Sequence, residues 1–594
     1  MTRTPCRHLL TIALAAAALA LAAAASADLT IFSVKAKPAA KPPAHAAPRK
    51  AEHKAVAVHH PARKSEPAQR EARHPSPSLP DALVVSRSGN TPYKTISSAL
   101  AKAASGSLIT VEPGVYDESL TLARSVTLRA DPRAPAGSVI VESDSAPCLT
   151  VVSPSGLVQG ITFKSSELGA TPIQTDIDVE QGSVTIQGCD IGPASAVCVL
   201  VRGAAASPTF RGCSIHDGGK DTVLTADSSS PKFIDCTIVG TQEAGVMLRS
   251  NSHPTLSNCT ISNTNPWGGD VDNLIGFAVY IGGCDDGLLK GCSIGPTNNS
   301  CVYADGGSAI FDACSVHDSG RDGMTLEKGS DCTVENCDVS RCAWCGIAAD
   351  GCPDLLLDDN IHDIQRSAVL ALRSATVTAT GCELYGNVKY NFDIYGSAST
   401  LKKCLVHDTT VPGVHLDSTS AVTMDDCDIM RTGMAAVFDE GGALTIHDGH
   451  FTDLPQDGVR CDGASACTID GLTVQNAAGA DILVNDGAKL LDLSNCVISR
   501  AAQCGVAIHQ ADAVTITNCV IEDCTSVGLG DVAANVAVQG TKFTACTVAF
   551  SIQNTGSATM KDCTFTGDKW LSDQPRPNVV MTNCTYPASA IARN

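Results

Sequence analysis

Short apolar alternations separated by turn residues recur along most of the chain. One copy reads AGVML (residues 244–248), PTL (254–256) and CTI (259–261), and the same three pieces return in the next period. Alternation with a period of two is typical of a strand with one buried face, so we expect Val246 and Leu248 to point inward. Each period therefore predicts three strands of about three to five residues joined by tight bends.

A cysteine column marks the period, which is about 22 to 24 residues at most steps. The residue just before the column is usually Gly, Asn or Asp, as at Gly212, Asp235 and Asn258, and these residues tolerate a positive φ. A bend repeated at a fixed period indicates a solenoid, here an all-β parallel β-helix with three short strands in each turn. The column consists of Cys189, Cys213, Cys236, Cys259, Cys292, Cys314, Cys337, Asp359, Cys382, Cys404, Cys427, Gly449, Leu472, Cys496, Cys519, Cys563 and Cys584.

Residues in one column of a solenoid stack on one another, so these cysteines are expected to form an inward ladder of reduced, packed thiols. A disulfide needs Cβ atoms that converge to about 3.8 Å, which aligned side chains do not provide. For CAWC (residues 342–345), zinc binding and redox chemistry stay open as alternatives to packing. The better candidates for disulfides lie outside the column, at Cys148, Cys198, Cys332, Cys342, Cys345, Cys352, Cys461 and Cys467.

The first 80 residues differ from the rest in composition. Residues 1–27 contain Arg3 and Arg7, an apolar run and Ala-Ser-Ala, which together predict a cleavable signal peptide. Residues 28–80 are rich in Ala, Pro, Lys and His, and this composition predicts a disordered linker. We therefore expect a secreted, periplasmic or cell-surface protein whose folded part covers residues 81–594.

Charge and hydropathy narrow the choice of partners. The formal net charge is −20 at pH 7 even though the linker is basic, which argues against nucleic acid. After the signal peptide, no apolar run approaches the roughly 20 residues that span a membrane. We expect a soluble monomer, and its acidity favours neutral glycans over uronates.

The start of the folded part adds a family resemblance. YKTISSALAKA (residues 93–103), ITVEPGVYDESLTL (109–122) and SVTLRAD (125–131), together with the repeat, resemble the right-handed parallel β-helix proteins of the pectin lyase-like superfamily. The resemblance implies a right-handed, single-stranded helix with an N-terminal cap at about 81–130, a C-terminal cap at about 565–594, and recognition of carbohydrate. We expect a capping helix near residues 95–104, where a bare turn would otherwise expose the core.

The catalytic signatures of the known enzymes of that superfamily are missing. The sequence has no GxxDFIFG as in pectin methylesterases, no paired DD with GHG and RIK as in polygalacturonases, and no DPHD as in mannuronan epimerases. The resemblance therefore carries the fold to this chain but not the reaction.

One outward column collects aromatic and acidic side chains. Tyrosines can stack on sugar rings, and a carboxylate near a histidine can take part in proton transfer. Read turn by turn, the column gives Tyr280, Tyr303 with Asp305, Thr325 with Glu327, Ala348 with Asp350, Leu370, Asp393 with Tyr395, His415 with Asp417, Phe438 with Glu440, and Arg460 with Asp462.

The densest part of this column is YNFDIYG (residues 390–396) followed one turn later by PGVHLDS (412–418). We expect His415 and Asp393 to transfer protons and Asp417 to orient His415. Tyr395 and Arg460 are expected to contact the substrate. The alternative is a solvated polar face without chemistry.

An inserted segment lies at one end of the column. NTNPWGGDVDN (residues 263–273) lengthens one turn by about ten residues, and such loops often carry function. It places Trp267 beside Tyr280 and Tyr303, and we expect all three to contact a substrate. An idle turn extension is the alternative.

Three carboxylates in successive turns are a candidate metal site. They repel one another unless a cation neutralises them, and Ca²⁺ takes several oxygen ligands. Their spacing of about 4.8 Å is loose for a single ion. The three residues are Asp305, Glu327 and Asp350.

Two functions remain open at this point. In the first, the protein recognises a polysaccharide along the exposed face and processes it as a lyase, hydrolase or epimerase. In the second, it is a non-catalytic structural or binding protein of the cell surface or envelope. No cofactor is required by either, with Ca²⁺ as the one candidate.

Overall fold

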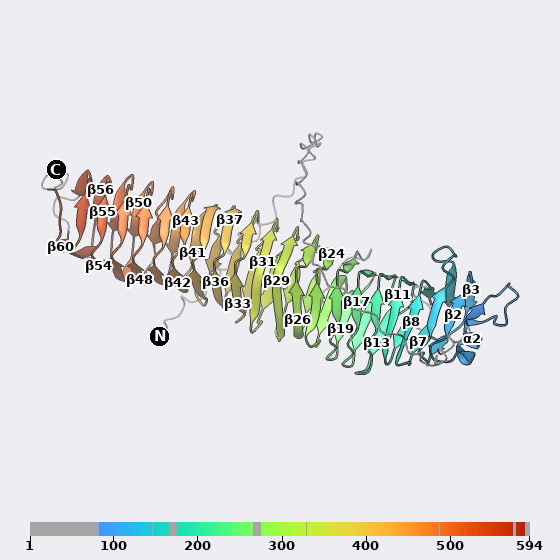
Figure 1. The fold of residues 1–594 in the computed structure, drawn as a ribbon. Coiled ribbons are helices and arrows are strands. Elements are labelled where there is room, and N and C mark those ends of the chain that lie inside the picture. Colours follow the sequence, from blue (N-terminus) through green and yellow to red (C-terminus); the bar gives the residue numbers. More distant parts are fainter. Residues whose placement is uncertain are drawn as a thin grey trace, which may run out of the picture. The chain divides into compact units, whose positions relative to one another are not determined.

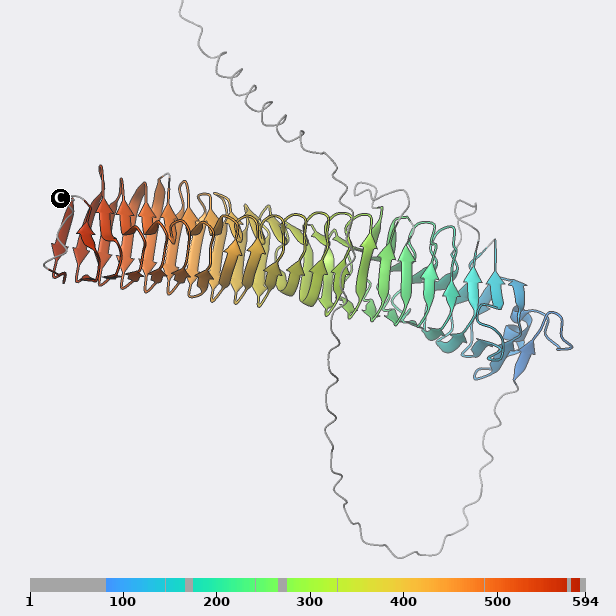
Figure 2. The same cartoon turned by 90° about the horizontal axis from the view of Figure 1, so that it is seen from above.

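A computed structural model describes residues 82–144, 146–165, 175–240, 242–264, 275–327, 329–485, 487–573 and 578–587. The predicted signal peptide, the whole of the predicted linker, and Trp267 lie outside the described residues. Within the unit Pro77–Asn594, parallel strands coil into a β-solenoid of about 21 turns, as Figures 1 and 2 show. The predicted all-β parallel helix is thus confirmed. Its turns outnumber the cysteines of the column because other residues take the column position in several turns, such as Ile161 before Cys189.

Each turn contributes one strand to sheet 1, in which neighbouring turns pair in parallel. Sheet 1 consists of β4 (Leu120–Leu122), β7 (Leu149–Val151), β10 (Ile177–Val179), β13 (Val199–Arg202), β16 (Val223–Ala226), β19 (Ala244–Arg249), β22 (Phe277–Gly282), β25 (Val302–Ala304), β28 (Met324–Leu326), β30 (Ile347–Asp350), β32 (Val369–Leu372), β35 (Phe392–Tyr395), β38 (Val414–Leu416), β41 (Ala435–Asp439), β44 (Asp457–Cys461), β47 (Ile482–Val484), β50 (Cys504–Ile508), β53 (Val527–Asp531), β56 (Val548–Ile552) and β59 (Trp570–Ser572).

The second strand of each turn belongs to sheet 2, which is also parallel throughout. Sheet 2 consists of β1 (Leu83–Val85), β2 (Leu108–Val111), β5 (Thr127–Ala130), β8 (Ser155–Gln159), β11 (Ser183–Gln187), β14 (Thr209–Arg211), β17 (Lys232–Ile234), β20 (Thr255–Ser257), β23 (Gly287–Lys290), β26 (Gly307–Asp312), the first parts of β29 (Ser330–Ser340) and β31 (Leu355–His362), β33 (Thr376–Thr380), β36 (Ala398–Lys402), β39 (Ala421–Asp425), β42 (Ala443–His447), β45 (Ala466–Asp470), β48 (Ala488–Ser494), β51 (Ala511–Thr517), β54 (Asn535–Gln539), β57 (Ser557–Lys561) and β60 (Val579–Thr582).

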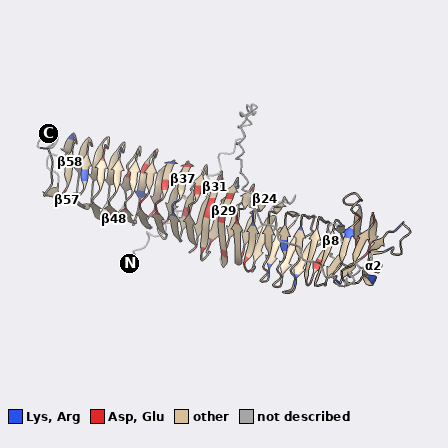
Figure 3. Cartoon of the chain, viewed as in Figure 1, with Lys and Arg blue, Asp and Glu red and all other residues tan. Residues whose placement is uncertain are grey.

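The third strand follows the bend at the cysteine column and belongs to sheet 3. Figure 3 shows acidic residues on β29 and β31, which run through this bend without a break. Besides the later parts of those two strands, sheet 3 consists of β3 (Gly114–Asp117), β6 (Val139–Glu142), β9 (Thr162–Lys164), β12 (Asp190–Ile191), β15 (Ser214–His216), β18 (Thr237–Gly240), β21 (Thr260–Asn263), β24 (Ser293–Thr297), β27 (Ser315–His317), β34 (Glu383–Tyr385), β37 (Leu405–Thr409), β40 (Asp428–Thr432), β43 (His450–Thr452), β46 (Thr473–Gln475), β49 (Val497–Ser499), β52 (Val520–Glu522), β55 (Lys542–Thr544) and β58 (Thr564–Thr566).

A short helix, α2 (Ile96–Lys102), lies within the segment that the sequence predicts to be helical. The Thr95 side chain accepts a hydrogen bond from the Ser98 amide and so caps its first turn. Ile96 and Ala99 are buried, and the helix packs against β1, β2 and β4. Its apolar face therefore joins the core at the N-terminal end of the solenoid.

The bend before the cysteine column has the predicted left-handed backbone. Gly212, Asp235 and Asn258 have φ values of 56°, 55° and 52°. Ala313 and Lys403 adopt the same conformation at this position, with φ values of 53° and 52°. The hydrogen bonds between neighbouring turns thus hold even residues that do not favour a positive φ by themselves.

The cysteine column is the predicted inward ladder of reduced thiols. Cys213 and Cys236 are buried and free, as are the other cysteines of the column, apart from Cys584, which is free and partly exposed. The Cys213 thiol donates to the carbonyl of Ile186 in the preceding turn at 3.4 Å and lies 3.6 Å from the carbonyl of Arg211. These weak hydrogen bonds satisfy the thiols without a disulfide.

We expect the folded protein to react with Ellman's reagent at very few thiols. Among the free cysteines described, Cys504 and Cys584 are partly exposed and the others are buried. Burial also raises the pKa of Cys342 to about 11 and that of Cys352 to about 12, which makes the reactive thiolate scarce. Denaturant should then release the remaining thiols together. A rapid reaction of many thiols without denaturant would contradict the packed ladder.

Candidate active site

The predicted aromatic and acidic column is one row of sheet 1. The register pairs each member with the next one in order from Tyr280 to Arg460, through Tyr303, Thr325, Ala348, Leu370, Asp393, His415 and Phe438. Much of the row is buried rather than solvated: Asp393 is 6% exposed and His415 is 2% exposed. The expectation of an open face is wrong here because large neighbours along the row cover one another.

Tyr280 and Tyr303 lie in an aromatic cluster. The Tyr303 ring stacks on Phe277 at a centroid distance of 4.9 Å and on Tyr280 at 5.8 Å, and the Arg249 guanidinium lies over Tyr280 at 5.2 Å. Both tyrosines are 6% exposed. Their ring faces are therefore occupied by protein, which does not favour the sugar contacts expected of them.

The strands β35 and β38 and the residue that follows β41 bring together a carboxylate, an imidazole and a second carboxylate. Asp393 Oδ1 lies 2.8 Å from His415 Nδ1, and His415 Nε2 lies 3.6 Å from Glu440 Oε2. Ser367 donates to the other Asp393 oxygen at 3.0 Å. Asp393 is buried and the Glu440 side chain is 51% exposed, so the row runs from the interior to solvent.

The environment of His415 favours its charged form. Burial by itself would lower the pKa of His415, but the hydrogen bond to Asp393 and the charges of Asp393 and Glu440 outweigh it, so its pKa is raised above the ordinary value. An imidazolium held between two carboxylates can pass a proton to the exposed carboxylate.

Aromatic side chains surround the imidazole. Tyr390 stacks on the His415 ring at a centroid distance of 4.7 Å, Tyr395 meets it edge-on at 5.3 Å, and Phe438 lies at 5.7 Å. Tyr395 is partly open to solvent. Arg460 lies over Phe438 at 5.2 Å and forms an ion pair with Asp462 at 2.8 Å. Tyr395 therefore contacts the imidazole, whereas Arg460 lies beside Phe438 two turns after His415.

Asp417 does not orient His415. Its carboxylate accepts hydrogen bonds from Ser420 at 2.5 Å and from the Gly396 amide at 3.0 Å. Although burial acts in the opposite direction, these bonds lower the pKa of Asp417 below its usual value. Asp417 closes the turn after β38, and the orienting carboxylate is Asp393 instead.

The sequence reading gave no role to Glu440 or Tyr390. Glu440 stands two residues after Phe438, so the column contained the signal for it. Tyr390 lies before β35, in a turn whose path the repeat does not determine. Its stacking on His415 could not be read from the period.

A basic row next to this cluster was also missed. Trp344 is exposed, and the guanidinium groups of Arg321 and Arg366 lie over its ring at 4.7 Å and 4.3 Å. Backbone bonds stack Arg321, Trp344, Arg366 and Lys389 in four successive turns. Within the described part of the chain, neither Arg366 nor Lys389 forms an ion pair. Their spacing of about 22 to 23 residues is the period itself, which could have revealed them.

The comparison with known families decides the classification. The family described as "Right handed beta helix region" matches residues 153–277, 277–451 and 457–589. The chain belongs to this right-handed β-helix family. No curated protein matches the sequence.

Several solved structures match this chain, each with low sequence identity and a low TM-score. The PL6 family alginate lyase AlyGC has a TM-score of 0.26 and 9% identity, covering 83% of this chain and 98% of that chain. Pectate lyase Pel9A has a TM-score of 0.24 and 14% identity, covering 59% and 76%. The mannuronan C-5 epimerase AlgE6 A-module from Azotobacter vinelandii has a TM-score of 0.20 and 11% identity, covering 83% and 93%.

The right-handed β-helix holds the three candidate calcium ligands in successive turns, as expected. Asp350 forms an ion pair with Arg373, and Asp305 is exposed. Their oxygen atoms do not form a group within 4.8 Å of one another. Arg373 thus neutralises part of the charge that a cation was expected to neutralise, and calcium binding stays a prediction.

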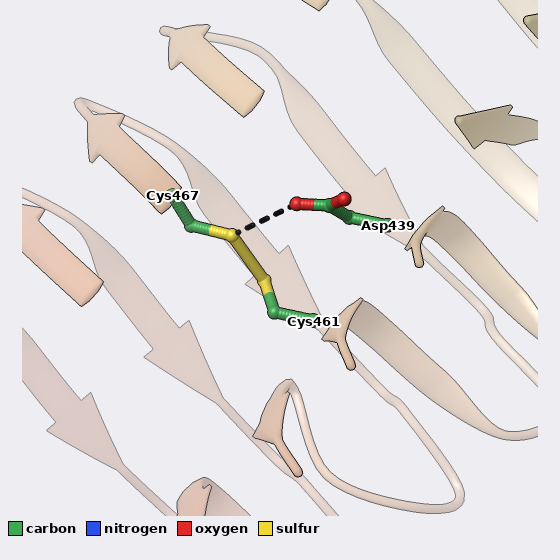
Figure 4. A group of neighbouring side chains, drawn as sticks. All are labelled: Asp439, Cys461 and Cys467. Carbon is green, nitrogen blue, oxygen red and sulfur yellow. Dashed lines mark hydrogen bonds between the residues drawn. A yellow bond between two sulfur atoms is a disulfide. The ribbon is translucent and has the colours of Figure 1, made fainter. Parts of the chain in front are cut away.

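The inside of the right-handed β-helix holds another group of ligand-type residues. Among the described residues, the one set of three with ligand atoms within 4.8 Å is Asp439, Cys461 and Cys467, which Figure 4 shows. Cys461 and Cys467 form a disulfide, and the Cys467 sulfur lies 3.4 Å from Asp439 Oδ2. Two of the cysteines predicted to form disulfides are therefore bonded, and Cys342 and Cys345 are buried and free. The disulfide removes both thiolates from metal binding.

No helix in the described ranges is both long enough and apolar enough to cross a membrane.

Proposed function

We propose that this protein is exported and that it binds and processes a polysaccharide at the Asp393–His415–Glu440 row. The observation that carries the proposal is the row itself, in which a buried carboxylate holds an imidazole against a half-exposed carboxylate. The three side chains connect the interior with solvent through a histidine, which can carry a proton. Such an arrangement can resupply a proton to a carboxyl group at the surface.

In this proposal Glu440 is the group that meets the substrate. His415 is nearly inaccessible, so it acts through Glu440 and restores its proton or its charge. Tyr395 offers a partly exposed ring beside the row, on which a sugar ring can stack. Trp344 with Arg366 and Lys389 extends the surface toward earlier turns and brings positive charge to an acidic protein.

A non-catalytic binding protein is the second candidate. It is favoured by the burial of His415 and by its aromatic packing, which also suits a side chain that only holds three turns together. In that case the surface at Tyr395 and Trp344 would bind a glycan without turnover.

The test combines binding and turnover on a panel of neutral and acidic polysaccharides, read by affinity electrophoresis, new reducing ends and unsaturated uronates. We expect Glu440→Gln to lower kcat/KM by about 10² to 10⁴ while binding is kept, because it removes the surface acid. Tyr395→Ala should weaken binding about tenfold or less through the lost stacking.

The matched control is Glu383→Gln. Glu383 also pairs with a histidine, since its Oε1 lies 3.2 Å from His407 Nε2, but it lies in sheet 3. This variant should keep full activity. Binding without turnover in the wild type favours the second candidate, and a lack of binding to every polysaccharide contradicts both.

A further inference from the structure

A groove lies on the bend between sheets 2 and 3, in the turns that carry β5, β8, β11 and β14. Its volume is about 430 Å³, within the range of about 300 to 1,000 Å³ that is usual for small-molecule sites. The proline-containing segment 131–137 forms one rim, and Asp190 and Ser214 at the starts of β12 and β15 form the other. It is many turns from His415 along the chain's order of strands, which places it outside the candidate active site.

Glycines create this groove. The bend before the cysteine column is Gly160, Gly188 and Gly212 in three successive turns, and all three line the groove. A Cβ atom at Gly188 or Gly212 would meet nothing within 4 Å, so the space above the bend is open. In the next two turns Asp235 and Asn258 take the same position.

The side chains at those later turns close the groove. Asn258 donates to Asp235 at 3.3 Å, and Asp235 forms an ion pair with Arg211 at 3.6 Å. The groove is thus bounded along the solenoid by a change from glycine to Asp and Asn in one column.

Arg129 is the cationic residue that lines this groove. Its Nε atom is buried and has no hydrogen-bond partner, and the side chain forms no ion pair with any described residue. Asp131 on the rim interacts with Arg129 electrostatically, but Arg133 holds that carboxylate through two hydrogen bonds of 3.1 Å and 3.0 Å. A buried N–H group without a hydrogen bond is costly, and an anion in the groove that accepts from Arg129 Nε would remove that cost.

The rest of the lining is suited to hydroxyl groups. Gln159 follows Arg129 in register one turn later, and Thr162 and Ser214 contribute hydroxyls. Asp190 is held by His216 Nε2 at 3.1 Å through one oxygen, with a side chain that is half exposed. Donors and acceptors therefore surround a single cationic group.

We propose that this groove binds a small polyhydroxylated carboxylate, such as a sugar acid. Arg129 pairs with its carboxylate, and Gln159, Asp190 and Ser214 bind its hydroxyl groups. The site is distinct from the Asp393–His415–Glu440 row and does not depend on it. Sulfate, phosphate and simple carboxylates can also pair with the Arg129 cation, but they lack the sugar hydroxyl groups. They are therefore the comparison ligands.

The experiment is isothermal titration of the full chain with D-glucuronate, D-glucose, acetate and inorganic sulfate. We expect glucuronate to bind at the millimolar level, and the other three at least about tenfold more weakly, because each lacks either the carboxylate or the hydroxyls. If glucose bound as tightly as glucuronate, the role of Arg129 would be contradicted. Equal binding of acetate or sulfate would contradict the sugar-like ligand, and no binding of glucuronate would overturn the proposal.

Two variants locate the binding. Arg129→Gln should weaken glucuronate at least about tenfold, whereas Arg211→Gln, from the same row but outside the groove, should not. Gly188→Asn should fill the groove and have a similar effect. Asn is compatible with the left-handed bend, as Asn258, Asn495 and Asn518 show at equivalent positions.

Gly381→Asn is the matched control for the filled groove. Gly381 takes the same column position with a φ of 71°, far along the chain from the groove. Thermal unfolding checks that all variants are folded. If Gly188→Asn binds glucuronate as the wild type does, the ligand lies elsewhere and the proposal fails.

Discussion

Asp481→Asn should stabilise the β-helix strongly at alkaline pH and change its stability little at acidic pH. Asp481 is fully buried beside the core strand β47, and burial raises its pKa to about 8. Above that pH the folded protein must either bury the charged carboxylate or keep the carboxyl group protonated, and both cost free energy relative to the unfolded chain. We expect a gain of a few kcal/mol at about pH 9, since each unit of pKa shift corresponds to about 1.4 kcal/mol.

The sign follows from the two pKa values of the group. In the unfolded chain Asp481 loses its proton near its ordinary value, about 4, whereas in the folded protein it keeps the proton up to about 8. Its contribution to stability is therefore full below about pH 4 and is lost as the pH rises to about 8. Asp359, Asp221 and Asp531 act in the same direction, because burial raises their pKa values to about 9, 7 and 6.

Urea unfolding at a series of pH values measures this effect. The control is Asp470→Asn, because hydrogen bonds from Ser494 and Asn495 lower the pKa of the partly exposed Asp470. This substitution should not increase the free energy of unfolding at alkaline pH. The substitution at Asp481 is tolerated sterically, since Asn391 occupies the equivalent place before β35. An equal gain for Asp481→Asn at acidic and alkaline pH would rule out the titration as its cause.

Phe233→Ala should destabilise the protein by about 3 to 5 kcal/mol, the usual range for removing a buried aromatic ring. Phe233 is fully buried and stacks on Phe210 of the preceding turn, with centroids 4.8 Å apart and an interplanar angle of 9°. The parallel sheets allow little collapse around the missing ring, because each turn is fixed by hydrogen bonds to both neighbours. Denaturant unfolding monitored by circular dichroism gives the loss.

Phe233→Leu separates the loss of the ring from the loss of volume. The next residue in register is Leu256, so the column already accommodates leucine beside phenylalanine. We expect this variant to lose less than about 1.5 kcal/mol. If it lost as much as the alanine variant, the stacking geometry rather than the filled volume would be responsible.

The fold was predictable from the sequence because one local event repeats. A left-handed residue before each cysteine, as at Asp235 and Asn258, determines where the chain bends, and the alternation in the strands determines which side is buried. The same period correctly aligned Asp393, His415 and Phe438 across turns. These features depend on backbone geometry alone.

The details of the site were less predictable, because they depend on side-chain packing between turns. An outward position is exposed only if its neighbours are small, and Tyr390, Tyr395 and Phe438 are not, so His415 became buried. The role expected of Asp417 failed for a similar reason. Its nearest donors are in its own turn, at Ser420, rather than in the column.

The repeated bend also bears on how such a protein can evolve. Since each coil presents the same edge to the next, loss or duplication of one whole coil in the gene would leave every remaining interface matched. The glycine-lined groove and the Asp393–His415–Glu440 row are each assembled from particular adjacent coils. For these two sites, the place at which a coil is lost or added therefore matters. A coil added between them would change the spacing of the two sites and leave both intact, whereas a coil inserted between β35 and β41 would separate one of the two carboxylates from the imidazole.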